Sequence, residues 1–172
     1  MGVNWRNLSV LIGAVVLAGA WIGQGQADSE VVFPMPPGPL YVKECGSCHT
    51  AYAPGLLPAR SWQKMMNELD NHFGEDASLE EPERLAILRW LTDYAADGPN
   101  ANMLMRRIAA SIPRGAAPQR ITETPLFRHQ HDEVPAHIWK RSRIGSPSNC
   151  SACHTRANEG RYPEREVRIP RN

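Results

Sequence analysis

All four cysteines of this chain fall in two copies of one pattern, Cys-x-x-Cys-His. The first copy is Cys-Gly-Ser-Cys-His at residues 45–49, and the second is Cys-Ser-Ala-Cys-His at residues 150–154. Two thiols at this spacing lie on one side of a helical turn, where each can add to a vinyl group of a haem, and the histidine that follows can reach the iron. The pattern therefore predicts two covalently attached haem c groups. The predicted attachment residues are Cys45, Cys48, Cys150 and Cys153.

Other uses of paired cysteines fit this chain less well. A structural zinc site usually has its cysteine pairs about 15–20 residues apart, whereas 100 residues separate His49 from Cys150. Thioredoxin-type redox chemistry places Cys-x-x-Cys beside a βαβ unit, and no such pattern is present. Disulfide bonds would leave the histidine after each pair unexplained. We therefore expect His49 and His154 to be the proximal ligands of two haem irons.

The opposite side of the first iron has a histidine and two methionines as candidates. His72 lies 23 residues after His49, on the same apolar stripe as Met65, so the chain between them can pass around a haem edge. A histidine at a helix end can instead serve only as a favourable cation there. Met65 and Met66 are alternative ligands, although methionines on an apolar stripe more often serve as packing. The spacing favours His72 and leaves the methionines open.

Three histidines precede the second motif and compete for the second iron: His129, His131 and His137. If residues 123–131 are helical, positions two apart point about 200° away from each other, so only one of His129 and His131 can face the haem. His131 shares a face with Phe127, four positions earlier, and an apolar companion suits a buried role. The pattern favours His131, with His129 and His137 as alternatives.

Helical patterns must place these residues, because no segment shows a strand alternation of useful length. Ser61 is expected to cap one helix, and Ser78 followed by Glu81 three positions later has the capping-box pattern for another. The first motif is expected on a short helix. Besides this short helix within residues 40–52, the expected helical segments are residues 62–73, 79–96, 102–111, 123–131 and 136–141. The predicted fold class is therefore mainly α, with long loops.

The first 27 residues have the pattern of a secretory signal peptide. Arg6 supplies a positive start, residues 8–22 are almost wholly apolar, and residues 25–27 (Gly-Gln-Ala) offer small side chains at positions −3 and −1 of a cut after Ala27. An uncleaved anchor is the alternative, because residues 8–25 carry no charge. We expect a cleaved, exported chain of 145 residues with no transmembrane segment.

Charge is balanced over the whole chain but not along it. The totals of 19 basic and 18 acidic residues give no reason to expect nucleic-acid binding. Residues 28–112 hold 7 basic and 12 acidic residues, a net −5, whereas residues 113–172 hold 11 and 6, a net +5. We expect these two ranges to be the first and second haem-binding domains, with a boundary near residues 113–118. Such a charge dipole can orient an approaching partner.

Longer stretches of the chain resemble the bacterial periplasmic dihaem cytochrome c family, called DHC. In the first half they are residues 54–62 (Pro-Gly-Leu-Leu-Pro-Ala-Arg-Ser-Trp) and 69–75 (Leu-Asp-Asn-His-Phe-Gly-Glu). In the second half they are Arg120-Ile121, Pro125, Phe127, His131, Asn149, Ala157, Gly160 and Ile169-Pro170 around the second motif. The similarity extends over essentially the whole expected mature chain.

The resemblance implies a periplasmic electron carrier, not an enzyme, in which two histidines hold each iron. On the matched positions, His72 becomes the distal ligand of the first haem and His131 that of the second. The first domain is expected to resemble a class I cytochrome c, and the second to wrap its haem with little regular structure. Family members are associated with a small oxygen-binding haem protein and with membrane b-type cytochromes, so similar redox partners are implied here.

Two other functions also use two haems. A dihaem peroxidase-type enzyme needs an open iron position, and four histidines left for two distal positions argue against one. A dihaem subunit of a larger periplasmic reductase, similar to that of periplasmic nitrate reductase, fits less well with 100 residues between the motifs. The expectation is an electron carrier with two low-spin, six-coordinate haems.

Overall fold

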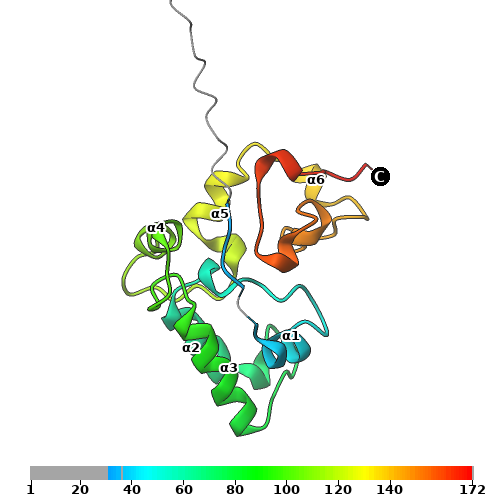
Figure 1. Cartoon of the computed structure of the whole chain (residues 1–172). Coiled ribbons are helices and arrows are strands. Elements are labelled where there is room, and N and C mark those ends of the chain that lie inside the picture. The colour runs from blue at the N-terminus through cyan, green and yellow to red at the C-terminus, as the bar shows by residue number, and fades with distance from the viewer. Residues whose placement is uncertain (1–30, 36, 172) are drawn as a thin grey trace, which may run out of the picture.

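The computed structural model of the chain describes residues 31–35 and 37–171 (Figure 1). The expected signal peptide at residues 1–27 lies outside them. In the described ranges the chain forms α-helices and short 3₁₀ turns, and its only β structure consists of isolated bridges. No helix in these ranges is both long and apolar enough to cross a bilayer. The predicted mainly α fold class is confirmed.

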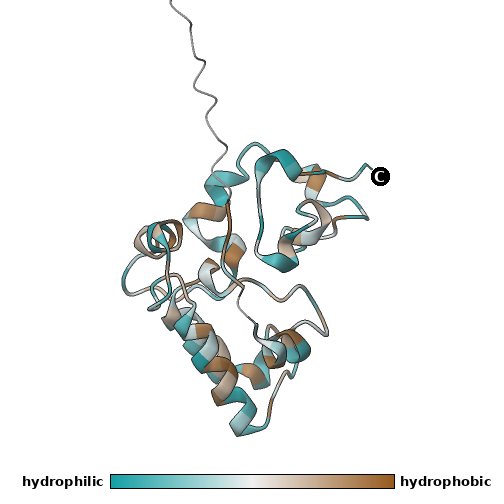
Figure 2. Cartoon of the chain, in the orientation of Figure 1, coloured by the Kyte–Doolittle hydropathy of each residue, from teal (hydrophilic) through white to brown (hydrophobic). Residues whose placement is uncertain are grey.

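The first half of the chain contains four α-helices. They are α1 (Pro39–Cys45), α2 (Ala59–Asn67), α3 (Glu81–Asp93) and α4 (Met103–Ser111). Helices α2 and α3 pack along each other, and α1 packs against α3. Figure 2 shows hydrophobic and hydrophilic residues interleaved along these helices, which is the pattern of helices that bury one face.

Two clusters of buried apolar side chains hold this half together. One contains Trp62 of α2 with Ile87 and Leu91 of α3, and the other contains Met105 and Ile108 of α4. The Trp62 indole is fixed within the first cluster because its Nε1–H donates to the carbonyl oxygen of Pro54 at 2.8 Å. These clusters fix the helices, and His49 and His72 lie on segments outside the clusters.

Helix α2 differs from its predicted range of 62–73 at both ends. It begins after Pro58, so Ser61 lies inside the helix, fully buried, and caps nothing. It ends at Asn67 and is followed by a 3₁₀ turn over Leu69–Asn71. The prediction that His72 lies on this helix is wrong, because its backbone N–H donates to the carbonyl of Glu75 at 2.7 Å.

The starts of α3 and α4 differ in whether a side chain caps them. Glu80, not Ser78, precedes α3, because the N–H of Ser78 is taken by the side chain of Asp76 at 2.9 Å. Helix α4 agrees with the predicted range 102–111 except at Asn102, which caps the helix: its side chain accepts from the N–H of Met105 at 2.9 Å. An Asn at this position satisfies one of the backbone donors that a helix start leaves free.

The second half is loop-rich, as expected. Its helices are α5 (Pro125–Gln130) and α6 (Ala136–Trp139), both shorter than predicted, and its 3₁₀ turns are η3 (Ile121–Glu123), η4 (Cys150–Ala152), η5 (Ala157–Glu159) and η6 (Glu164–Glu166). Thr124 caps α5 by accepting from the N–H of Phe127. Pro125 begins α5 and Pro135 directly precedes α6, and proline is favourable at a helix start because its φ is already fixed near the helical value.

The N-terminal end of the described chain joins the second half, not the first motif. Phe33 N–H donates to Gly160 O at 2.8 Å, and Tyr162 N–H donates to Val31 O at 2.9 Å (Figure 1). Gly160 has a left-handed φ of 68°, and a Cβ there would collide with the carbonyl oxygen of Phe33. This close approach of two backbones explains the glycine.

Candidate haem sites

The first site comprises Cys45, Cys48, His49 and His72. The imidazole ring centroids of His49 and His72 lie 6.1 Å apart, with their planes inclined by 23°. A metal bonded at about 2 Å to one nitrogen of each ring would separate the centroids by about 6 Å. The gap therefore has the width that one iron atom between two imidazoles requires.

The methionine alternatives lie elsewhere. Met66 is buried in the cluster around Trp62, and Met65 packs against the same cluster. Both side chains therefore serve as packing on α2. The structure pairs His49 with His72, which is the pairing that the sequence favoured.

The prediction that the first motif lies on a short helix is right only for Cys45, because the rest of the motif follows the helix end. Helix α1 ends at Cys45, with Gly46 as its C-cap, and Cys48 and His49 follow in a turn. His49 Nδ1 lies 2.8 Å from the carbonyl oxygen of Thr50. Because a carbonyl oxygen only accepts, Nδ1 carries the proton and Nε2 keeps its lone pair for a metal.

A tight turn delivers His72. Its N–H and C=O both bond to the backbone of Glu75, and the two residues between them, Phe73 and Gly74, have φ of 57° and 104°. Gly74 adopts this left-handed backbone easily because it has no Cβ. In Phe73 the Cβ is crowded by the backbone in the same conformation. The pKa of His72 is lowered by burial, then by His49 and by Arg120.

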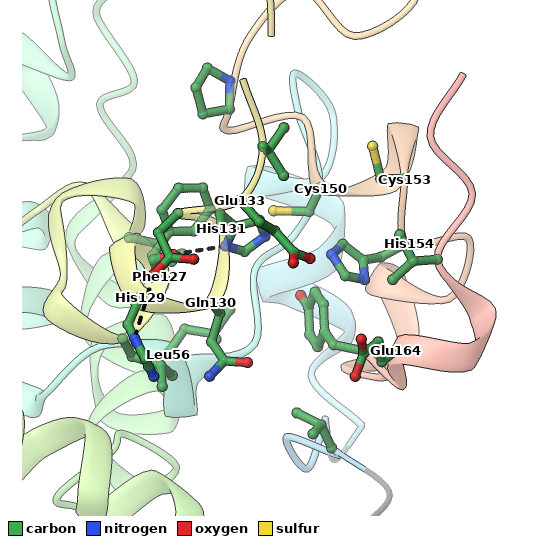
Figure 3. Close-up of a pocket in the computed structure, with 18 of the residues that line it drawn as sticks. Leu56, Phe127, His129, Gln130, His131, Glu133, Cys150, Cys153, His154 and Glu164 are labelled. Carbon is green, nitrogen blue, oxygen red and sulfur yellow. Dashed lines mark hydrogen bonds and ion pairs between the residues drawn. The ribbon is translucent and has the colours of Figure 1, made fainter. Parts of the chain in front are cut away.

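The second site comprises Cys150, Cys153, His131 and His154. The ring centroids of His131 and His154 are again 6.1 Å apart, but their planes are inclined by 78°. Figure 3 shows the two rings pointing toward each other, with Cys150 beside them. They face a cavity of about 820 Å³, within the range that holds sizeable organic ligands. Residues of the first half also line it, among them Phe33 and Leu56.

Helix α5 positions His131 directly after its last residue. The His131 Nδ1–H donates to the carbonyl oxygen of Phe127 at 2.8 Å, which leaves Nε2 free for a metal. The ring stacks on Phe127 with centroids 4.1 Å apart and lies 5.9 Å from the ring of Trp139. The predicted pairing of His131 with Phe127 is confirmed.

The two alternative histidines are exposed to solvent. The side chain of His129 is 78% exposed at the rim of the cavity, where Nδ1 lies 3.9 Å from the Asp132 carboxylate. His137 is exposed on α6. Of these three histidines, His131 is the one whose ring contacts that of His154.

His154 is held by backbone and by an aromatic neighbour. Its N–H donates to the carbonyl of Cys150 at 2.8 Å, and the Tyr162 ring lies 5.3 Å away, edge to face. Burial, followed by the nearby His131, lowers the pKa of His154. This direction favours the neutral imidazole of His154, the form that binds metals.

The cysteines support haem attachment over the other uses of thiols. All four lie in the described ranges and none forms a disulfide bond. Burial raises the pKa of Cys45 and of Cys150 to about 11, so both stay protonated at neutral pH. Among the described residues, no three or more His, Cys, Asp or Glu side chains converge as a structural metal ion requires.

The two sites touch each other, a contact that nothing in the sequence predicted. Thr50, next to His49, shares a 2.8 Å hydrogen bond with Ser151 inside the second motif, 101 positions away. Tyr52 stacks on His49 with centroids 5.1 Å apart, and its hydroxyl donates to the carbonyl of Ser148 at 2.8 Å. No role was predicted for Tyr52 or for Tyr162 at the second site, because no spacing rule links them to the motifs across the fold.

Known proteins with this arrangement are dihaem cytochromes. A family model described as dihaem cytochrome c matches residues 41–162. A diheme cytochrome c from Rhodobacter sphaeroides is 43% identical with a TM-score of 0.65, and the match covers 75% of this chain and 99% of that one. The diheme cytochrome sb-DHC from Shewanella baltica OS155 is 36% identical with a TM-score of 0.64, covering 79% and 95%. A comparison with curated proteins gives no match.

Proposed function

We propose that this chain, which belongs to the dihaem cytochrome c family, carries electrons between redox partners through two haems that are each ligated by two histidines. Membership makes it an electron-transfer haem protein with two covalently bound haem c groups. When bound, each haem supplies an iron that accepts and releases one electron. The proposed ligands are His49 and His72 in the first site and His131 and His154 in the second.

The observation that carries this proposal is the equal gap of the two histidine pairs. Both pairs place their ring centroids 6.1 Å apart, although one consists of nearly parallel rings and the other of nearly perpendicular ones. An iron held from both sides has no free position for a substrate. The arrangement therefore supports electron transfer over chemistry at the metal.

The chain's own groups hold the rings still. His49 and His131 each donate Nδ1–H to a backbone carbonyl, which fixes the ring and directs Nε2 toward the metal. Aromatic neighbours restrict the rings further: Tyr52 covers His49, and Phe127 covers His131. Rigid ligands need little rearrangement when the charge on the metal changes, which favours rapid electron transfer.

The contact between the sites gives an electron a route through the molecule. The bonds from Thr50 to Ser151 and from Tyr52 to Ser148 join the first site directly to the second motif. We infer that electrons enter at one haem, cross at this contact and leave at the other. The proposed domain boundary near residues 113–118 then separates two halves that these two hydrogen bonds join.

The periplasm is the proposed location. The pattern of residues 1–27 supports export, and cytochromes c of this kind are typically exported. The proposed partners are a small oxygen-binding haem protein and a membrane b-type cytochrome, on the resemblance to the family. The net +5 of residues 113–172 favours an acidic docking face on one of them.

Spectroscopy of the purified holoprotein tests this proposal. Intact mass should equal the cleaved chain plus two haems, and the spectra of both haems should be low-spin in each oxidation state. The reduced protein should bind no carbon monoxide. A high-spin charge-transfer band together with carbon monoxide binding in the unmodified protein would show an open iron and support the peroxidase-type alternative.

A further inference from the structure

A segment from the second half of the chain lies over the turn that delivers the first distal histidine. The guanidinium carbon of Arg120 lies 4.0 Å from the centroid of the Phe73 ring, and that ring lies 4.8 Å from the ring of His72. The preceding residue, Gln119, donates to the carboxylate of Glu68 at 2.9 Å. The segment is thus anchored on the approach to the His72 turn, more than 45 positions away in the sequence.

The turn needs such support. Phe73 has a left-handed φ of 57°, which is an outlier for an aromatic residue and persists only where surrounding contacts hold it. Its side chain is 48% exposed, so the core does not fix it. Arg120 supplies a planar cation on the ring face, which is a favourable contact.

The same residue brings charge to the site. An arginine stays protonated at every pH at which the protein is folded, so Arg120 places a fixed positive charge on the Phe73 ring beside His72. Its nearest counter-ion, Glu123, lies 3.8 Å away with its side chain 54% exposed, so neutralisation is incomplete. Solvent around the half-exposed guanidinium weakens the field without removing it.

We propose that Arg120 is a positioning residue for the first haem: it holds the Phe73–Gly74 turn against His72 and, through its charge, raises the reduction potential of that haem and not of the other. A ferric centre carries one more positive charge than a ferrous one, so a nearby cation disfavours the oxidised state. The proposal rests on ligation of the first haem by His49 and His72. According to this proposal, a residue of the second half contributes to the difference in reduction potential between the two haems.

The test is a redox titration of the holoprotein followed by electron paramagnetic resonance, with the two low-spin signals assigned from His72→Ala and His131→Ala. Arg120→Gln should lower the potential of the first haem, seen at fixed ambient potential as about a two- to fourfold rise in its ferric-to-ferrous ratio. The second haem should keep its ratio. Arg120→Lys, which keeps the charge, should restore most of the wild-type value.

Arg114→Gln is the matched control. Arg114 is exposed in the same connecting segment, and its substitution changes the net charge by the same amount. It should shift neither haem selectively. Equal shifts in Arg120→Gln and Arg114→Gln, an unchanged first haem in Arg120→Gln, or an equal fall in Arg120→Lys would each overturn the proposal. Failure of the ligation itself is distinguishable, because His72→Ala would then leave both signals low-spin.

Discussion

The two haem sites hold their histidines at one separation by different means. In the first site a tight turn after α2 supplies His72, and the rings lie within 23° of parallel. In the second the end of α5 supplies His131, and the rings are inclined by 78°. The hydrogen-bonded ring is the proximal His49 in one and the distal His131 in the other. Two different local backbones therefore bring a pair of histidines to the same separation while giving the rings different relative orientations.

The strongest way to separate the sites is to open them one at a time. His72→Ala should convert only the first haem to a high-spin form that binds carbon monoxide, and His131→Ala only the second, because each removes one axial ligand. Optical and paramagnetic resonance spectra of the purified variants measure both changes. His129→Ala and His137→Ala are the matched controls and should leave both haems low-spin. Loss of the second signal in either control, with retention in His131→Ala, would show that the ligand was assigned wrongly.

The ring planes predict two distinct ferric signals in the unmodified protein. Nearly parallel imidazoles split the two iron d orbitals that have π symmetry about the ligand–iron–ligand axis, whereas nearly perpendicular imidazoles leave these two orbitals almost equal in energy. The first haem should therefore give a rhombic spectrum and the second a strongly anisotropic signal with a large maximal g value. Frozen-solution spectra of His72→Ala and His131→Ala assign each signal. Two identical rhombic signals would contradict the difference in ring orientation.

Gly160→Ala should destabilise the second half far more than the first. The new Cβ would meet the backbone of Phe33 and would also require a left-handed φ, so we expect a loss of about 3 kcal/mol or more in the free energy of unfolding. Gly145 has a similar φ of 73° with open space around it, so Gly145→Ala should cost only about 1 kcal/mol. Denaturant unfolding of both holoproteins compares them. Equal losses would show that the contact with Phe33 adds nothing.

The contact between the sites offers a smaller effect. Tyr52→Phe removes the hydroxyl that bonds to Ser148 while keeping the ring on His49, and should cost about 1 kcal/mol of unfolding free energy. Tyr94→Phe, whose hydroxyl makes no hydrogen bond in the described chain, is the control and should be neutral. Thermal unfolding detects the difference. If Tyr52→Phe leaves the free energy of unfolding unchanged, the contact between the sites depends on the hydrogen bond of Thr50 with Ser151 alone.

Ionic strength should give the smallest contrast between the halves. The electron-transfer rate with an acidic reductant protein should fall as salt rises, because the basic second half attracts it over a distance that shrinks from about 30 Å at 0.01 M to about 8 Å at 0.15 M salt. A basic reductant should instead be attracted to residues 28–112. Stopped-flow reduction with each reductant measures the slopes. Rates that are flat for both would show that the charge division does not guide docking.

The sequence supported some predictions and not others for physical reasons. The pairing of His131 with Phe127 follows from helix periodicity, so a local pattern sufficed for it. The four attachment residues follow from covalent chemistry and stay a prediction. The end of α2 could not be predicted from a local pattern. The apolar stripe continues to His72, but the backbone of His72 is hydrogen-bonded to that of Glu75. Ser61 has a cap's chemistry, yet burial placed it inside α2.

The features that distinguish the two sites were beyond local patterns altogether. The ring angles depend on how distant segments meet, and the contact of Thr50 with Ser151 joins residues 101 positions apart. Arg120 reaches Phe73 from the other half of the chain. Such contacts carry no periodic signal, because each is made only once in the fold.

The pairing of residues 31–35 with residues 160–162 governs the order in which the molecule can be assembled. Phe33 and Val31 line the cavity of the second site, yet their backbone partners, Gly160 and Tyr162, lie close to the other end of the chain. Residues 31–35 and 160–162 are about 125 positions apart, so their pairing closes a loop that runs through both halves. Closing so long a loop is slow. The helices of the first half pack through contacts that are closer in the sequence, whereas enclosure of the second cavity by Val31 and Phe33 depends on this long-range closure.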